Sequence, residues 1–231
     1  MMKNFSKLIV GALFAGSMSI VAAAQDASTT DAKHYKVVLE NEYVRVLRVN
    51  YGVKEKSVPH QHPDAVAVMM TPMQGKFTLA DGKTEDRNSK AGDVLWTPAV
   101  VHTPENTGAK PFEVILVELK ERRRDGPSSV VPAEDPLKVA PEHHKLEFEN
   151  DRVRVIRGRA GPGEKSAMHE HPANVVILLT DVSLKSTSAD GKSEESTSKR
   201  GEVLWRAPLK HASANPGDKP YEVVIVEIKG T

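Results

Sequence analysis

The sequence contains no cysteine. This absence excludes disulfide bonds, a thiol-linked lipid anchor and structural zinc sites built from thiolates. A chain of 231 residues without disulfides depends on an apolar core for its stability, and 39% hydrophobic residues are enough to build one. Any metal site in this chain must therefore use nitrogen and oxygen ligands.

The sequence also has little net charge, with 32 basic and 31 acidic residues and a formal charge of +1. No cluster of basic residues is large enough to favour a nucleic acid or an anionic membrane surface as a partner. We therefore expect a small-molecule substrate or ligand and no nucleic acid. Composition leaves a homodimer open.

Long apolar runs are lacking except at the amino terminus, where residues 1–24 are typical of a secretory signal peptide. Lys3 and Lys7 form the basic region, an apolar run follows, and three alanines precede Gln25. The apolar run is shorter than the roughly 20 residues of a membrane-spanning helix, which disfavours an uncleaved anchor. We predict a periplasmic or secreted protein that has no membrane contact after signal cleavage.

Amphipathic helices of useful length are absent from the rest of the sequence. Residues 34–120 instead contain short β-branched runs, such as 44–49, 65–71 and 112–119, and a strong hairpin signal at Asp81-Gly82. Residues 25–33 are small and polar and predict a flexible leader. Residues 121–141 are rich in charge and proline and predict a linker. The fold class is therefore all-β.

A long internal repeat divides the chain. His60-Gln-His62 returns as His169-Glu-His171, and His102 returns as His211, each 109 residues later with no insertion or deletion between them. A period this long indicates duplication of a whole domain. We predict an N-terminal domain at 34–120 and a C-terminal domain at 142–231.

The repeated histidines predict a metal site in each half. Residues i and i+2 of a strand face the same side, so His60 and His62 can point into one barrel. His102 follows a later strand, and closing the barrel could bring it opposite the pair. Three neutral imidazoles suit iron, manganese, zinc, nickel or copper and leave ligand positions free. The candidate metal ligands are His60, His62, His102, His169, His171 and His211.

These motifs resemble those of the cupin superfamily, over nearly all of the chain after residue 33. The histidine pair matches the family's first motif, and Gly92, Pro98, His102 and Asn106 match its second. The resemblance implies a bicupin, with two tandem double-stranded β-helix (jelly-roll) barrels. The family's glutamate ligand would fall near Val66 or Ala67, and both are apolar, as are the matching residues of the second half.

A site with three histidines and no carboxylate resembles the three-histidine cupins, which include iron dioxygenases. Three neutral ligands leave the full charge on a bound ion, which favours an anionic chelating substrate. We therefore expect a divalent transition metal, with iron favoured, and dioxygenase chemistry on a small enolisable or chelating substrate. The alternatives are a non-catalytic small-molecule, zinc or copper binder of the envelope, and a zinc-type hydrolase or isomerase. The sequence indicates no protein nucleophile or general base.

Six further residues are candidates for the pockets. The two lysines could hold an anion or lie at strand ends in water. The tryptophans could wall the pocket or pack in the core, and the glutamates could be buried partners of histidines. Their positions are Lys56, Lys165, Trp96, Trp205, Glu118 and Glu227. His34, His143 and His144 lie at the domain starts, where we expect them to be exposed to solvent.

Overall fold

The computed structural model describes residues 25–121 and 131–230. The predicted signal peptide lies outside the described residues, as do residues 122–130 of the predicted linker, so export stays a prediction of the sequence. Within the described ranges, no helix is long and apolar enough to cross a membrane.

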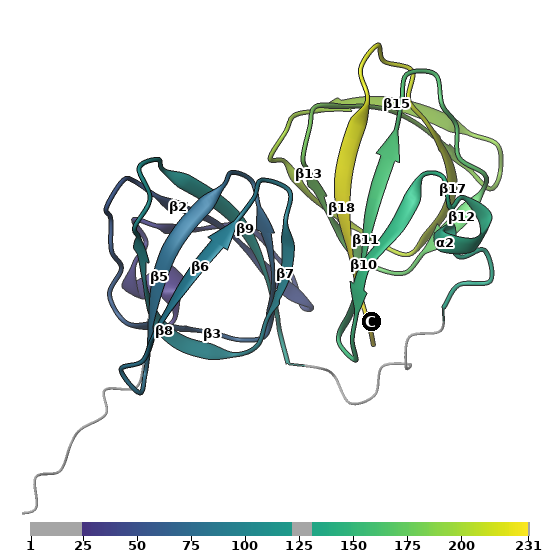
Figure 1. The fold of residues 1–231 in the computed structure, drawn as a ribbon. Helices are drawn as coiled ribbons and strands as arrows, with labels where there is room; N and C mark the ends of the chain where they lie inside the picture. Colours follow the sequence, from purple (N-terminus) through teal and green to yellow (C-terminus); the bar gives the residue numbers. More distant parts are fainter. Residues whose placement is uncertain (1–24, 122–130, 231) are drawn as a thin grey trace, which may run out of the picture.

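Each half of the chain forms a barrel of two antiparallel sheets (Figure 1). In the N-terminal barrel, one sheet has the order β1-β2-β9-β4-β7 and the other β3-β8-β5-β6. The strands are β1 Tyr35–Glu40, β2 Val44–Tyr51, β3 His60–His62, β4 Ala65–Met69, β5 Met73–Leu79, β6 Thr84–Ser89, β7 Val94–Thr97, β8 Val100–Asn106 and β9 Phe112–Leu119.

The C-terminal barrel repeats this arrangement, with sheets β10-β11-β18-β13-β16 and β12-β17-β14-β15. Its strands are β10 His144–Glu149, β11 Val153–Ala160, β12 His169–His171, β13 Asn174–Leu178, β14 Val182–Ser188, β15 Ser193–Ser198, β16 Val203–Arg206, β17 Leu209–Ala214 and β18 Tyr221–Ile228. The all-β class and the two jelly-roll barrels predicted from the sequence are thus confirmed.

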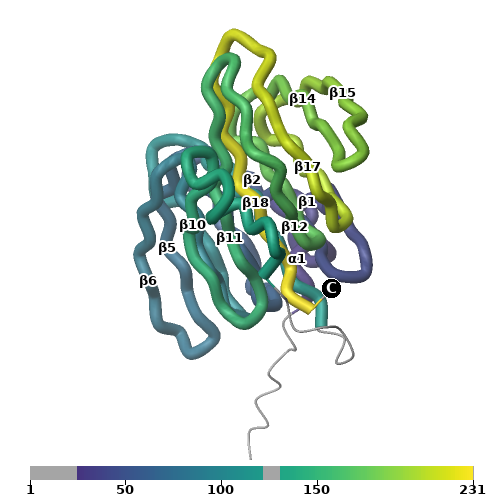
Figure 2. The backbone as a smooth tube through the Cα atoms, turned by 90° about the vertical axis from the view of Figure 1, so that its right-hand side faces the viewer, coloured from purple at the N-terminus to yellow at the C-terminus, as the bar shows by residue number. Residues whose placement is uncertain are grey.

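The two barrels pack against each other through their five-stranded sheets, as Figures 1 and 2 show from two directions. One apolar cluster joins Val46, Val66 and Val117 of the first barrel to Val155 and Val226 of the second. Alternate residues of the same strands, such as Leu47 of β2, line the barrel interior instead. Both faces of these sheets are therefore buried, which explains why their strands are apolar almost throughout.

Of the two roles left open for the tryptophans, the structure shows packing in an apolar core, at this interface, and not in the wall of a pocket. In β7, Trp96 packs against the cluster shared by the barrels, while its neighbours Leu95 and Thr97 line the inner cavity. Trp205 likewise packs against the shared cluster and stacks on Tyr43 of the other barrel, with ring centroids 5.5 Å apart. Strand alternation sends each indole outward because the residues on either side of it face inward.

Arginines complete the interface with near-symmetric contacts. Arg48 donates to the carbonyl of Gly201 at 2.5 Å, and its counterpart Arg157 donates to the carbonyl of Gly92 at 2.6 Å. Each of these glycines has a φ of +85°, in the left-handed region that favours glycine. The turn glycines of one barrel thus accept hydrogen bonds from the other.

Two short helices correct the predicted leader. Helix α1, Ala27–Thr30, begins at Asp26, whose side chain accepts from the Ser28 amide. Ala27 is fully buried in the core of the N-terminal barrel, so this part of residues 25–33 belongs to the domain. Helix α2, Pro136–Val139, begins at Asp135 in the same way, within the predicted linker. The repeat therefore starts at least as early as Asp26 and Asp135.

Candidate metal centres

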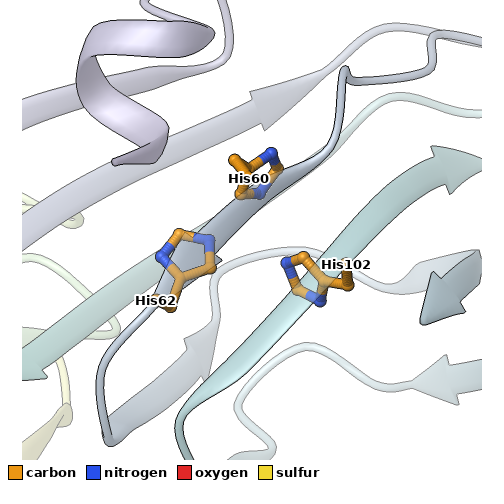
Figure 3. A group of neighbouring side chains, drawn as sticks. All are labelled: His60, His62 and His102. Carbon is orange, nitrogen blue, oxygen red and sulfur yellow. The ribbon is translucent and has the colours of Figure 1, made fainter. Parts of the chain in front are cut away.

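Three histidines of the N-terminal barrel converge in its interior (Figure 3). His60 and His62 come from β3, where Gln61 between them is exposed, and His102 of β8 is paired directly with His60. Their ring centroids lie 4.9–5.3 Å apart, and one ligand nitrogen from each lies within 4.8 Å of the others. The strand alternation argued from the sequence thus brings these three residues together.

Hydrogen bonds leave one nitrogen of each β3 histidine available to a ligand. Nδ1 of His60 donates to the Val58 carbonyl at 2.8 Å, and Nδ1 of His62 donates to Glu118 at 2.6 Å. A neutral imidazole that donates from Nδ1 carries its lone pair on Nε2. Nε2 of His60 and of His102 are buried without a hydrogen-bond partner. A divalent metal ion would satisfy these atoms, so the residues fit such an ion.

Two histidines of the triad, His60 and His102, are neutral at physiological pH. Burial, and then the neighbouring His62, lower the pKa of His60 to about 4. The same two causes, in the same order, lower the pKa of His102 to about 2. A metal ion therefore competes with no proton for these nitrogens near neutral pH.

Behind the triad, a charged chain supports His62. Glu118 is 1% exposed and accepts hydrogen bonds from His62 and from Arg45 Nε, the latter at 2.7 Å. Arg45 also pairs with Asp26, the residue that caps α1. A carboxylate behind a ligand histidine fixes the ring orientation and raises its basicity.

The same chain recurs in the second barrel. Nδ1 of His171 donates to Glu227 at 2.8 Å, and Arg154 pairs with Asp135 and lies 3.6 Å from Glu227. Burial raises the pKa of Glu227 to about 7 despite the opposing effect of Arg154. Glu118 and Glu227 are therefore both placed as partners of histidines, the role proposed for them from the sequence.

Above the N-terminal triad lies a cavity of about 620 Å³, open mouth included. Its walls are mostly apolar. Two residues of the triad, His62 and His102, line it. Arg87 also lines it and lies over the Phe77 ring, 4.9 Å from the ring centroid. Other lining residues are Tyr35, Tyr51, Ala67, Met69, Met73 and Phe112.

The pocket role considered for the two lysines is not observed, and the structure shows the alternative, in which both lie in water. The Lys56 side chain is 56% exposed, with Nζ 3.8 Å from Glu105, and Lys165 is exposed as well. The chain between β2 and β3 is a turn and an isolated bridge rather than a continuous strand, so the parity with His60 breaks down. The neighbouring Ser57, rather than Lys56, faces the buried His60.

The C-terminal barrel brings together the predicted His169, His171 and His211 and one residue that the sequence reasoning missed. The ring of His211 lies 4.6 Å from that of His169 and 5.8 Å from that of His171. His144 of β10 lies 4.7 Å from His169, with 9% of its surface exposed. Burial first, then neighbouring charges, lowers the pKa of His144, His171 and His211 to about 3 each.

The expectation that the domain-start histidines are exposed is therefore wrong for His144 and His34, which are buried, and for His143, whose side chain is 10% exposed. His34 is 4% exposed, stacks on Tyr51 with ring centroids 4.1 Å apart, and hydrogen bonds Asp31 at 2.6 Å. In each barrel the first residue of the first strand is buried, whereas the two residues that follow it are exposed. Tyr35 occupies the position in β1 that His144 occupies in β10.

Comparison with known proteins places the fold. No protein-family model and no curated protein matches the chain. A cupin domain from Bordetella pertussis Tohama I is 31% identical over 37% of this chain and 91% of that chain, with a TM-score of 0.35. A cupin 2 conserved barrel domain protein from Leptotrichia buccalis is 13% identical, covering 84% of this chain and 88% of that chain, with a TM-score of 0.51.

Two enzymes share the fold across both barrels. A salicylate 1,2-dioxygenase mutant from Pseudoaminobacter salicylatoxidans is 12% identical, covering 80% of this chain and 71% of that chain, with a TM-score of 0.55. The oxalate decarboxylase of Bacillus subtilis, described with Mn(II) centres, is 12% identical, covering 83% and 70%, with a TM-score of 0.58. At these identities the likeness concerns the fold.

Proposed function

Because the chain belongs to the cupin superfamily and carries two barrels with histidine groups suited to metal, we propose that it is a metal-dependent dioxygenase. The N-terminal barrel would be the active one, with iron held by His60, His62 and His102. The substrate would be a small enolisable or chelating organic anion. Export by residues 1–24 is part of the proposal, and the intact mass of the mature protein is expected to correspond to a chain that begins at Gln25.

The observation that carries this proposal is the open apolar cavity above a three-histidine group. His62 and His102 line that cavity, so a substrate bound in it can contact a metal ion held by the triad nitrogens. Ala67 lies on the cavity wall, at one of the two positions where the family's glutamate would fall. The small side chain leaves room there for substrate. A ferrous ion on three neutral ligands would supply activation of dioxygen and attraction for an anionic chelate.

The surrounding residues would bind and orient the substrate. Arg87 brings positive charge to the cavity lining and suits a carboxylate or enolate. The hydroxyls of Tyr35 and Tyr51 lie 3.0 Å apart, and burial raises the pKa of both, so they remain neutral donors. The apolar lining, including Met69 and Phe112, keeps water from the site.

Oxygen consumption tests the proposal. The mature chain, loaded anaerobically with Fe(II), would be exposed to air with a panel of β-dicarbonyls, hydroxylated aromatic acids and thiols. We expect uptake with at least one compound, lost in His60→Ala and retained in the matched variant His169→Ala. Arg87→Gln is expected to raise KM for an anionic substrate more than it lowers kcat.

The absence of uptake from a fully iron-loaded protein across the panel would contradict the dioxygenase proposal. Zinc or copper in the protein purified without chelator, together with that result, would favour the envelope metal-binding alternative or a zinc-type hydrolase or isomerase.

A further inference from the structure

The two barrels differ at one interior position that faces the histidines. In the N-terminal barrel this position is Tyr35, whose ring lies 4.7 Å from that of His60. In the C-terminal barrel it is His144, whose ring lies 4.7 Å from that of His169 and 5.8 Å from that of His171. A phenol in one barrel is thus replaced by a further imidazole in the other.

We propose that the C-terminal barrel binds its metal ion through four histidines, His144, His169, His171 and His211, as a closed site of the structural zinc type. The fourth ligand comes from the first strand of the barrel, β10. The inference rests on the metal-binding part of the function proposed above and is independent of the dioxygenase reaction. It assigns different roles to the two sites.

The placement of His144 matches that of a ligand. One nitrogen each from His144, His169 and His171 lies within 4.8 Å of the others, the same closeness as in the N-terminal triad. His211 is paired directly with His169 across β12 and β17, and its ring lies 4.6 Å from that of His169. His144, His169 and His171 therefore form one close group, and the ring of His211 lies beside that of His169.

The hydrogen bonds of all four histidines leave the same atom for the metal. In each of the four histidines, Nδ1 has a hydrogen-bond partner. When Nδ1 of a neutral imidazole donates a hydrogen bond, the lone pair that can bind a metal is on Nε2. These partners are the Ala140 carbonyl for His144 at 3.1 Å, the Ala167 carbonyl for His169 at 2.8 Å, Glu227 for His171 at 2.8 Å and the Ser186 hydroxyl for His211 at 3.1 Å.

A packing role alone accounts poorly for His144. Tyr35 is held by the hydroxyl of Tyr51, whereas the residue of β11 at the place of Tyr51 is Ala160. His144 therefore does not reproduce the hydroxyl pair of the first barrel. It instead fixes its ring through the carbonyl of Ala140, just after α2, and turns its other nitrogen toward the histidines.

The residues around the C-terminal group have lost the features that would hold a substrate. The positions of Phe77 and Arg87 in the first barrel are occupied by Ser186 and Ser196 in the second, and Ser186 is bound to His211. Four neutral nitrogen ligands fill the tetrahedral shell that zinc prefers in structural sites, which leaves no position for substrate. The C-terminal ion would therefore stabilise its barrel.

A residue swap between the barrels tests this inference by metal binding alone. In a His60→Ala/His102→Ala background, which disables the N-terminal site, cobalt(II) would be bound as a spectroscopic probe and zinc affinity measured by competition with a chromophoric chelator. The strong visible absorption of four-coordinate cobalt is expected. His144→Tyr should weaken that absorption and lower zinc affinity by more than about 100-fold, because the loss of a residue behind a ligand usually costs only about 10- to 100-fold.

The control is His143→Tyr, the same substitution one residue earlier, where the side chain hydrogen bonds the carbonyls of Arg159 and Lys165. It is expected to leave spectrum and affinity unchanged. X-ray absorption spectroscopy of the zinc-loaded background chain measures the number of imidazole ligands without a substitution at His144. We expect four imidazoles on the zinc ion.

A count of three imidazoles, or a His144→Tyr variant with unchanged cobalt spectrum and zinc affinity, would overturn the four-histidine site. If the background chain bound no metal, both the four-histidine site and the proposal that the second barrel binds metal would be overturned. The absence of oxygen uptake would affect only the dioxygenase proposal.

Discussion

At the scale of single residues, the candidate ligand histidines differ in which group accepts the hydrogen bond from their Nδ1 nitrogen. His60 and His169 donate to backbone carbonyls, whereas His62 and His171 donate to the buried carboxylates of Glu118 and Glu227. A carboxylate makes the imidazole a stronger ligand than a carbonyl does, because it stabilises positive charge on the ring. In each barrel, a buried carboxylate thus lies directly behind one candidate ligand histidine.

Glu118→Gln tests this role. The substitution keeps the shape of the side chain but removes the charge that His62 and Arg45 share. We expect the affinity of the N-terminal site for zinc or iron to fall by about 10- to 100-fold, measured by chelator competition in a chain whose C-terminal site is disabled by His169→Ala. Glu113→Gln, on the same strand but paired with Arg48 at the interface, is the matched control. Equal affinities in the two variants would refute the role.

Residue patterns predicted the site well where a regular strand carries it. His60 and His62 share a strand, so their common direction followed from alternation. Lys56 failed because the intervening chain is a turn. Sequence reasoning missed His144 because a histidine at the start of a strand has no distinctive spacing, and because its counterpart in the first half, Tyr35, is not a metal ligand. The repeat nevertheless contained a signal, since it aligns this histidine with a tyrosine beside the first histidine group.

At the scale of elements, the short helices α1 and α2 attach the chain ahead of each barrel to the metal site. Asp26 caps α1 and also pairs with Arg45, which in turn holds Glu118. Four-residue helices have no stability of their own, so these contacts and the burial of Ala27 fix α1 in place.

Asp26→Ala is therefore expected to destabilise the protein. Loss of an N-cap usually costs about 0.5–2 kcal/mol, and Arg45 also loses a partner. Chemical denaturation of the metal-free chain would measure the free energy of unfolding. Asp86→Ala, at an exposed position of β6, is the control and should change it by less than about 0.5 kcal/mol. If both variants unfolded at the same denaturant concentration, α1 would not be part of the folded unit.

Strands were more predictable than these helices. The expected run 112–119 is β9 as observed, and the Asp81-Gly82 turn joins β5 to β6 with a φ of +81° at Gly82. The leader and linker were misread in part because small polar and proline-rich sequences give no periodic signal. Their order comes from single contacts, such as that of Asp135 with Arg154, that only the folded barrel supplies.

At the scale of the whole molecule, two barrels of the same topology share one apolar interface and differ inside. The interface residues Val46 and Val155 occupy equivalent places, as do Arg48 and Arg157 with their glycine acceptors. The interiors differ at Tyr35 and its counterpart. The sequence predicted two barrels but not how they pack together. A strand that is apolar on both faces does not indicate which part of the molecule covers its outer face.

The central claim is that each barrel binds one metal ion through its own histidines. Metal content per chain, measured by mass spectrometry after loading with zinc or iron and removal of excess, tests it most directly. We predict two ions in the wild type, one in His60→Ala/His102→Ala, one in His169→Ala/His211→Ala, and none when all four substitutions are combined. A metal content that the combined variant leaves unchanged would contradict the account.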